Sequence, residues 1–280
     1  MNVRARSLGW LCLLAAGAAC AQTPPTLQSI QAHLQGPVLI LRGLYDGDRL
    51  QFNASGELRN LAGVTPFSLS AIHIENLRLT GSHLEIDAVR EGLEFHRPSQ
   101  PGERVSVTAA PWDPTDLVRI QIDIDRHHPD QLYAALARVF APGFDDALTM
   151  AAPDYWQPWL RHYLHPDNPA DRLRTLLQEE NRDESCRAPG VRPPQLLQGF
   201  QPNFSEAARM ARYQGAVVVH LTVEPNGEPD GVLVIRPLGM GLDENAVEAV
   251  RHYQFNPATE DGNPIACDTN VVVSFRLSQE

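Results

Sequence analysis

Apolar and polar residues alternate along most of the chain between residues 22 and 165, with turn residues between the alternating runs. Such a period of two is typical of strands with one buried face, and the segment 118–124 shows it most clearly. Asp46-Gly47 stands between two apolar runs and predicts a hairpin that leads into residues 50–52. We therefore expect a β-rich N-terminal domain over residues 22–165, made of antiparallel strands that begin as a meander.

Helical spacing replaces the alternation toward the end of this stretch. Leu132, Leu136 and Val139 recur at helical spacing after Pro129-Asp130, which is a suitable helix start. The aromatic-rich segment 153–160 is expected to pack on the sheet. Five prolines then mark residues 166–194 as a linker, with one short helix expected at 171–180.

The last 80 or so residues predict the order helix, strand, strand, helix, strand. Ser205 is placed to cap the first helix and Gly215 to end it. The alternating runs 217–223 and 232–235 flank Pro225-Asn226-Gly227, a hairpin turn, and a final strand covers 271–275. The second helix opens at Leu242, with Asp243 near the positive end of the helix dipole. We expect a second, α+β domain over residues 195–280.

Four segments of this domain resemble, in order and spacing, the TonB C-terminal domain family. They are Phe204-Ser205-Glu206-Ala207-Ala208-Arg209, Gly215-Ala216-Val217-Val218-Val219, Gly239-Met240-Gly241-Leu242-Asp243-Glu244-Asn245-Ala246 and Tyr253-Gln254-Phe255-Asn256-Pro257-Ala258. The resemblance covers roughly residues 195–280. It implies a three-stranded antiparallel sheet with two helices against it.

The resemblance also implies a partner. In this family, outer-membrane transporters or receptors offer a short extended segment that adds to the exposed edge of the sheet. Carried over to this chain, the partner-binding strand is the last one, whose residues are Asn270, Val271, Val272, Val273, Ser274 and Phe275. The alternative for this strand is that it is simply the third strand of a small closed core.

The chain departs from the energy-transducing members of the family. Its first apolar segment contains no His, and a strand-rich domain stands where those members carry a long Pro-rich spacer. Phe204-Ser205 replaces the Tyr-Pro of the family, and from residue 190 onward six Arg face eleven Asp and Glu. The architecture is more similar to secreted proteins that join a β-rich region to this module.

The first 21 residues have the pattern of a cleaved signal peptide. Arg4 and Arg6 precede an apolar run from Leu8 to Ala21 that ends in small residues. The run is about 14 residues, short of the roughly 20 that a spanning helix needs. We expect a periplasmic protein; the alternatives are a lipid anchor through Cys20 or an anchor in the inner membrane.

Signal cleavage leaves two cysteines, Cys186 and Cys267, in a compartment where disulfides persist. We expect them to form a disulfide. The alternative is a pair of buried, unpaired thiols.

The charge of the chain narrows the classes of function. All 23 basic residues are Arg, and the formal net charge is -11, so the chain as a whole repels nucleic acid. The absence of Lys excludes enzymes that depend on a phosphate-loop or Schiff-base lysine.

The remaining candidates for chemistry are weak. His162, His165 and Asp167 lack a recognised metal motif, and Asp123 and Asp125 share one side of a strand without further catalytic signature. We therefore expect no enzyme activity, no metal and no cofactor. The leading function is a periplasmic protein-binding module, in TonB-dependent transport. The alternatives are a structural envelope protein, including a homodimer, and a secreted enzyme with its site in the N-terminal domain.

Overall fold

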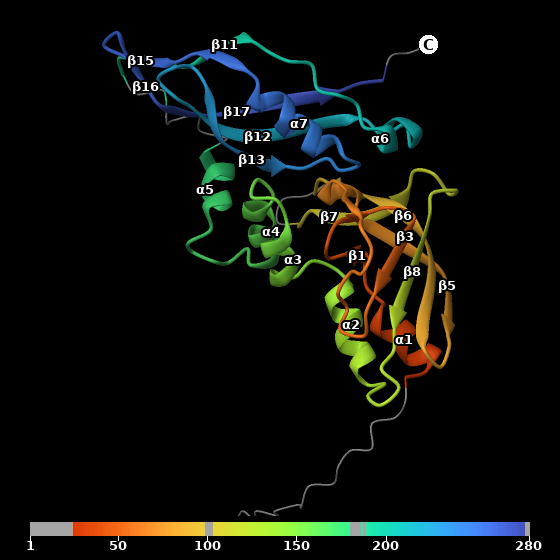
Figure 1. Ribbon diagram of the computed structural model, residues 1–280. Helices are drawn as coiled ribbons and strands as arrows, with labels where there is room; N and C mark the ends of the chain where they lie inside the picture. The colour runs from red at the N-terminus through yellow and green to blue at the C-terminus, as the bar shows by residue number, and fades with distance from the viewer. Residues whose placement is uncertain (1–24, 99–102, 180–185, 187–188, 278–280) are drawn as a thin grey trace, which may run out of the picture.

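The computed structural model describes residues 25–98, 103–179, 186 and 189–277 of the chain. The predicted signal peptide at residues 1–21 and the alternative lipid attachment at Cys20 lie outside these residues. Within the described part, no helix combines the length and the apolar character of a membrane span. The fold is α+β, with a β-rich N-terminal region (residues 25–165) and a smaller C-terminal region of sheets and helices (residues 195–277) (Figure 1).

A seven-stranded sheet forms the centre of the N-terminal region. Six strands follow the order β3-β8-β6-β5-β1-β9, and β7 pairs with the last six residues of β6. The strands are β1 (Ile40–Leu41), β3 (Arg49–Phe52), β5 (Ala71–Leu79), β6 (His83–His96), β7 (Ser106–Pro111), β8 (Leu117–Asp123) and β9 (Phe140–Ala141). Alternate residues of β8 are buried, so its apolar–polar alternation separates a core face from a solvent face, as predicted.

The hairpin predicted at Asp46-Gly47 is wrong. β2 (Tyr45–Asp46) pairs with β4 (Gly63–Val64), whereas β3 pairs with β8 in a parallel ladder. In this register, Leu50 and Phe52 lie beside Ile120 and Ile122, and all four are buried. β3 joins the distant β8 because that pairing buries its two large apolar side chains, so the strands of this region are not a simple antiparallel meander.

Helices α1 (Leu27–His33) and α2 (Gln131–Val139) cover one face of the sheet. Thr26 caps the start of α1, because its side chain accepts a hydrogen bond from the N–H of Ser29. Ile30 of α1 and Leu132 and Leu136 of α2 are buried in one cluster with β6 and β8. The helix predicted after Pro129-Asp130 is thus present, and its apolar stripe faces the core.

An aromatic cluster occupies the end of the N-terminal region that faces the C-terminal region. Its rings come from the 3₁₀ turn η1 (Phe67–Leu69), from β6, and from helix α4 (Gln157–Leu164) with residues that precede it; helix α3 (Asp146–Ala151) contacts α4. The ring of Trp156 lies 5.1 Å from that of Phe67 and 5.3 Å from that of Phe95. The predicted packing of segment 153–160 on the sheet is confirmed. Helix α5 (Arg172–Glu179) follows and contacts α4.

The C-terminal region is built on a three-stranded antiparallel sheet in the order β13-β12-β17, with two helices. Helix α7 packs against all three strands. Two small sheets, β10-β15-β16 and β11-β14, complete the region, and β10 belongs to the predicted linker (residues 166–194). The elements are β10 (Val191–Arg192), β11 (Gln195–Gln198), α6 (Glu206–Met210), β12 (Gly215–Val223), β13 (Pro229–Arg236), α7 (Leu242–Arg251), β14 (Gln254–Asn256), β15 (Ala258–Glu260), β16 (Asn263–Ile265) and β17 (Cys267–Phe275).

Ser205 caps α6 as predicted, because its side chain accepts the N–H of Ala208. Gly215, however, does not end that helix. α6 ends at Met210, and Gly215 is the first residue of β12. A Cβ at Gly215 would lie 2.8 Å from a methyl carbon of Leu238, so the glycine lies in close contact with that side chain.

Candidate partner-binding edge

The predicted partner-binding residues lie on an outer strand of the three-stranded sheet. β17 pairs with β12 along nine residues, from Gly215–Phe275 to Val223–Cys267. In the part of the chain that the structure describes, no strand pairs with the opposite edge of β17. Figure 1 shows β13 on the side of the N-terminal region and β17 on the far side of β12.

Side chains of β17 alternate between the core and the solvent. Val273 and Phe275 are buried, and the Phe275 ring meets that of Phe204 at 5.8 Å. Val272 is 63% exposed and Ser274 is exposed as well. Substitutions at these two positions therefore alter the surface of the strand without emptying the core.

The direction of the backbone groups of β17 follows from the neighbouring ladder. On β13, Val234 donates its N–H to the carbonyl of Tyr155, which lies away from β12. Val219 of β12 faces Val234, so these two residues form a pair without hydrogen bonds between them. Because the two residues of such a pair direct their N–H and C=O groups away from each other, those of Val219 point toward β17. Val219 faces Val271, so Val271 bonds to β12.

The same alternation along β17 turns the N–H groups of Asn270, Val272 and Ser274 to the open edge. Leu277 follows the same alternation. It is six residues after Val271, and its N–H donates a hydrogen bond at 3.2 Å to Oε1 of Gln214, on the β12 side. The edge thus presents a row of main-chain donors and acceptors.

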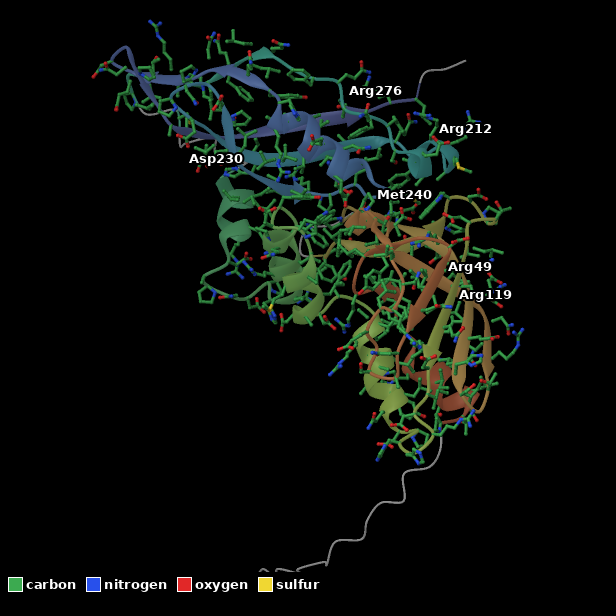
Figure 2. All side chains as sticks on the ribbon, viewed as in Figure 1. Arg49, Arg119, Arg212, Asp230, Met240 and Arg276 are labelled. Carbon is green, nitrogen blue, oxygen red and sulfur yellow. A yellow bond between two sulfur atoms is a disulfide. The ribbon has the colours of Figure 1, made fainter. Side chains whose placement is uncertain are left out.

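The other edge of the sheet is covered by the N-terminal region. Besides Val234, the loop after β13 is bonded to β6: Phe95 donates its N–H to Leu238 at 3.1 Å, and Met240 donates to Leu93 at 2.9 Å. Gly239 has φ +109, and a Cβ there would lie 1.9 Å from the carbonyl oxygen of Leu93. Met240 is fully buried where the two regions meet (Figure 2).

The carboxylate of Glu244, in the C-terminal region, bonds to residues of the N-terminal region. Glu244 of α7 accepts hydrogen bonds from the N–H of Ser68 at 3.0 Å, the hydroxyl of Ser68 at 2.7 Å and the indole N–H of Trp156 at 3.1 Å. Ser68 and Trp156 are both fully buried. The Ser68 hydroxyl also accepts the N–H of Gly241 at 2.8 Å, so η1 and the start of α7 are bonded in both directions.

Asp243, at the second position of α7, is fully buried beside Glu244. Its carboxyl oxygens accept the N–H groups of Leu238 at 2.8 Å and Gly239 at 2.6 Å. Burial, followed by the negative charge of Glu244, raises the pKa of Asp243 to about 8, although these hydrogen bonds act in the opposite direction. The sequence placed Asp243 at a helix start but gave no sign of this burial.

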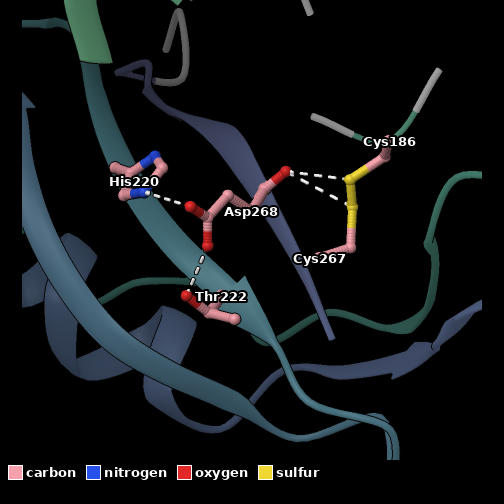
Figure 3. The surroundings of a disulfide bond; sticks show 5 residues. All are labelled: Cys186, His220, Thr222, Cys267 and Asp268. Atoms are coloured by element: carbon pink, nitrogen blue, oxygen red, sulfur yellow. Dashed lines mark hydrogen bonds and ion pairs between the residues drawn. A yellow bond between two sulfur atoms is a disulfide. The ribbon is translucent and has the colours of Figure 1, made fainter. Parts of the chain in front are cut away.

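A polar cluster and the disulfide lie at the beginning of β17 (Figure 3). Thr222 donates its hydroxyl to Asp268 at 2.6 Å, and Nδ1 of the buried His220 lies 2.9 Å from Oδ1 of Asn270. Among the described residues, Nε2 of His220 finds no hydrogen-bond partner, and it lies 3.9 Å from the Asp268 carboxylate.

Cys186 and Cys267 form the disulfide that the sequence predicts, with a Cα–Cα distance of 6.0 Å. It joins two positions that are 81 residues apart, and it ties Cys186 of the linker to the first residue of β17. The alternative of two unpaired thiols is not what the structure contains.

The residues considered for metal binding or catalysis make separate pairwise contacts. His162 bonds to Asp171, and His165 lies 2.8 Å from Asp146. Asp123 pairs with Arg59 at 2.6 Å, whereas Asp125 accepts the N–H of His127. Across the described ranges, no group of three or more His, Cys, Asp or Glu side chains is placed to hold a metal ion.

A family model matches the part of the chain that contains this sheet. Residues 201–277 match the family model described as "Gram-negative bacterial TonB protein C-terminal". No curated protein matches the chain. Among solved structures, the solution structure of the Pseudomonas aeruginosa TonB C-terminal domain is 19% identical, with a TM-score of 0.26, over 34% of this chain and 93% of that one. Residues 201–277 of this chain thus resemble the TonB C-terminal domain family.

Proposed function

We propose that this protein is a non-enzymatic binding module of the periplasm, whose β17 edge receives an extended segment of an outer-membrane transporter or receptor. The observation that carries the proposal is the open edge at residues 270–275, combined with the coverage of the opposite edge by the N-terminal region. Within the described residues, a segment that joins the three-stranded sheet has one edge to pair with, and that edge lies on the far side from the N-terminal region (Figure 1).

Main-chain hydrogen bonds supply most of the affinity in this mode of recognition. The outward N–H groups of Asn270, Val272 and Ser274 repeat every second residue and match the spacing of an added strand. Val272 adds an exposed apolar side chain next to them. The proposed role is in TonB-dependent transport, and the disulfide fits an oxidising compartment such as the periplasm.

The test compares Val272→Pro with Val272→Ala. Proline removes one outward N–H but no bond to β12, and edge strands tolerate proline when that N–H faces the solvent. One lost main-chain hydrogen bond contributes about 1 kcal/mol, and the proline ring also obstructs the incoming strand, so the Kd should rise about tenfold. Alanine keeps the N–H and should change the Kd by less than about threefold.

Binding is measured with peptides from the periplasmic N-terminal segments of outer-membrane transporters, and thermal unfolding of each variant is recorded in parallel. The proposal predicts that Val272→Pro loses affinity while its Tm stays close to that of Val272→Ala. If the proline variant binds the same peptides as tightly as the wild type, strand addition at β17 is wrong.

A second candidate function is favoured by the contact between the two regions. The bonds of Leu93 and Phe95 to the loop after β13, and those of Glu244, make the C-terminal region part of one structural unit with the N-terminal region. A purely structural envelope protein requires this contact but no open edge. Normal capture of transporter peptides by a variant with a weakened contact would favour the binding role, and absence of any peptide binding by the wild type would favour the structural one.

A further inference from the structure

A pocket of about 640 Å³ lies on the solvent-exposed face of the seven-stranded sheet, opposite to α1 and α2. Residues of β3, β8, β6 and β5 line it, and so does Pro114 from the loop before β8. Its volume falls within the range of roughly 300–1,000 Å³ that small-molecule sites occupy. The pocket is thus large enough for a small ligand.

Two arginines face each other in this pocket. Arg49 of β3 and Arg119 of β8 are direct neighbours in the parallel β3–β8 ladder, and both are exposed on the same face of the sheet (Figure 2). Neighbouring strands lie only about 4.8 Å apart, and like charges that face each other across two strands are destabilising. An anion that accepts hydrogen bonds from both guanidinium groups offsets this repulsion.

Arg49 has no anionic partner in the part of the chain that the structure describes. Its side chain makes neither a hydrogen bond nor an ion pair there, whereas Arg78 on the same face pairs with Glu85 at 2.6 Å. Arg119 donates its Nε–H to Asp87 at 3.0 Å, and its two terminal nitrogens bond to no described residue. Both arginines therefore keep N–H donors for a bound anion.

The charges around the two arginines favour an anion with a single negative charge. The positive charges of Arg49 and Arg119 exceed the negative charge of Asp87 by one. Asp48 and Glu75 line the pocket as well, and their carboxylates disfavour a ligand that carries two or more negative charges.

An apolar pair lies beside the arginines on the same face. Leu117 precedes Arg119 by two residues on β8, and it faces Val89 of β6 in the ladder that also pairs Arg119 with Asp87. Because alternate residues of a strand share a face, the side chains of Leu117 and Val89 stand on the same side of the sheet as the guanidinium groups. Leu117 is 56% exposed, so an alkyl chain that covers it removes apolar surface from water.

We propose that this pocket binds an amphipathic monocarboxylate of medium chain length. The carboxylate lies on Arg49 and Arg119, and the alkyl chain lies along Leu117 and Val89. Guanidinium groups bind carboxylates through parallel N–H donors, so the head group is recognised by its shape as well as by its charge. This site is separate from the β17 edge and does not depend on the partner-binding role.

The test titrates the protein by calorimetry with n-octanoate, n-butanoate, 1-octanol and n-octylammonium. The Kd of n-octanoate should be about tenfold below that of 1-octanol, because only the carboxylate gains charge-assisted hydrogen bonds. It should also be about tenfold below that of n-butanoate, whose shorter chain covers less of the apolar pair. n-Octylammonium should bind more weakly than 1-octanol, since the two arginines repel it.

Arg49→Gln isolates the head-group contact, because the Arg49 side chain bonds to no described residue and its loss leaves the fold intact. In this variant the Kd of n-octanoate should rise about tenfold, and that of 1-octanol should stay unchanged. Arg78→Gln is the matched control, since it removes an arginine from the same face outside the pocket, and it should bind all four probes as the wild type does. Leu117→Ser should weaken the binding of n-octanoate and 1-octanol alike.

A titration of the wild-type protein with n-octanoate, followed by NMR, places the site without any variant. The amide shifts should be confined to β3, β8, the facing parts of β6 and β5, and the loop before β8. Four results would each overturn the proposal: no binding of n-octanoate, a Kd of 1-octanol or n-octylammonium equal to or below that of n-octanoate, an unchanged affinity of Arg49→Gln for n-octanoate, and amide shifts outside the pocket.

Discussion

The contact between the two regions makes a sharp prediction for Glu244→Ala. The side chain of Glu244 accepts three hydrogen bonds from Ser68 and Trp156, and all three donors belong to the N-terminal region. Alanine removes the acceptors and leaves the helix intact, because alanine has the highest helix propensity. Besides these hydrogen bonds, the change removes the negative charge that helps to raise the pKa of Asp243.

The expected loss in the free energy of unfolding depends on which donors can find another acceptor. The N–H of Ser68 and the indole N–H of Trp156 belong to fully buried residues, so each stays without an acceptor in the variant. An unsatisfied buried donor costs about 1–3 kcal/mol, whereas the Ser68 hydroxyl can rotate. We expect Glu244→Ala to lower the free energy of unfolding by about 4 kcal/mol, the sum for two such donors at the middle of that range.

The assay is urea unfolding at pH 7, followed both by circular dichroism and by tryptophan fluorescence. Glu248→Ala on the same helix is the control: Glu248 is exposed, so its loss should change the free energy of unfolding by no more than about 0.5 kcal/mol. Glu244→Gln keeps the shape and part of the acceptor capacity and should fall between the two.

A small effect would refute the reasoning. If Glu244→Ala is within about 1 kcal/mol of Glu248→Ala, then the buried donors are not satisfied by this carboxylate in solution, and the close contact of the two regions is not held by it.

Two further predictions concern the disulfide and Asp243. Reduction of Cys186–Cys267 should lower the free energy of unfolding by about 4.5 kcal/mol in the chain-entropy model for a loop closed across 81 residues, and matched melts with and without reductant measure it; an unchanged Tm would contradict this. The folded-state pKa of Asp243 is raised from 3.8 to about 8, so the folded state holds a proton that the unfolded state loses. The contribution of this group to stability should be complete below about pH 4, decline as the pH rises from 4 to 8, and be lost above 8. Asp243→Asn should flatten that decline in urea unfolding measured from pH 5 to pH 9, and parallel profiles for variant and wild type would count against the buried proton.

Local signals in the sequence were enough for much of the C-terminal region. The alternating run 217–223, the turn at Pro225-Asn226-Gly227 and the cap at Ser205 predict β12, β13 and α6, and the structure contains all three. These features depend on residues a few positions apart, whose backbone preferences and side-chain periods act within one element. The disulfide could be predicted for a different reason. Only two cysteines remain after the expected signal cleavage, so only one pairing is possible within the chain.

Long-range pairing was decided only in the tertiary structure. Nothing near Arg49–Phe52 indicates that β3 joins β8 in parallel, because that choice depends on which distant strand offers a core face to Leu50 and Phe52. The sequence places Glu244 at a helix start, where a carboxylate is ordinarily a solvated partner of the helix dipole. Only the approach of Ser68 and Trp156, 176 and 88 residues away, gives it buried donors to bind. The same approach covers the β13 edge and leaves β17 as the open side of the sheet, since an edge is closed or open according to what the rest of the chain packs against it.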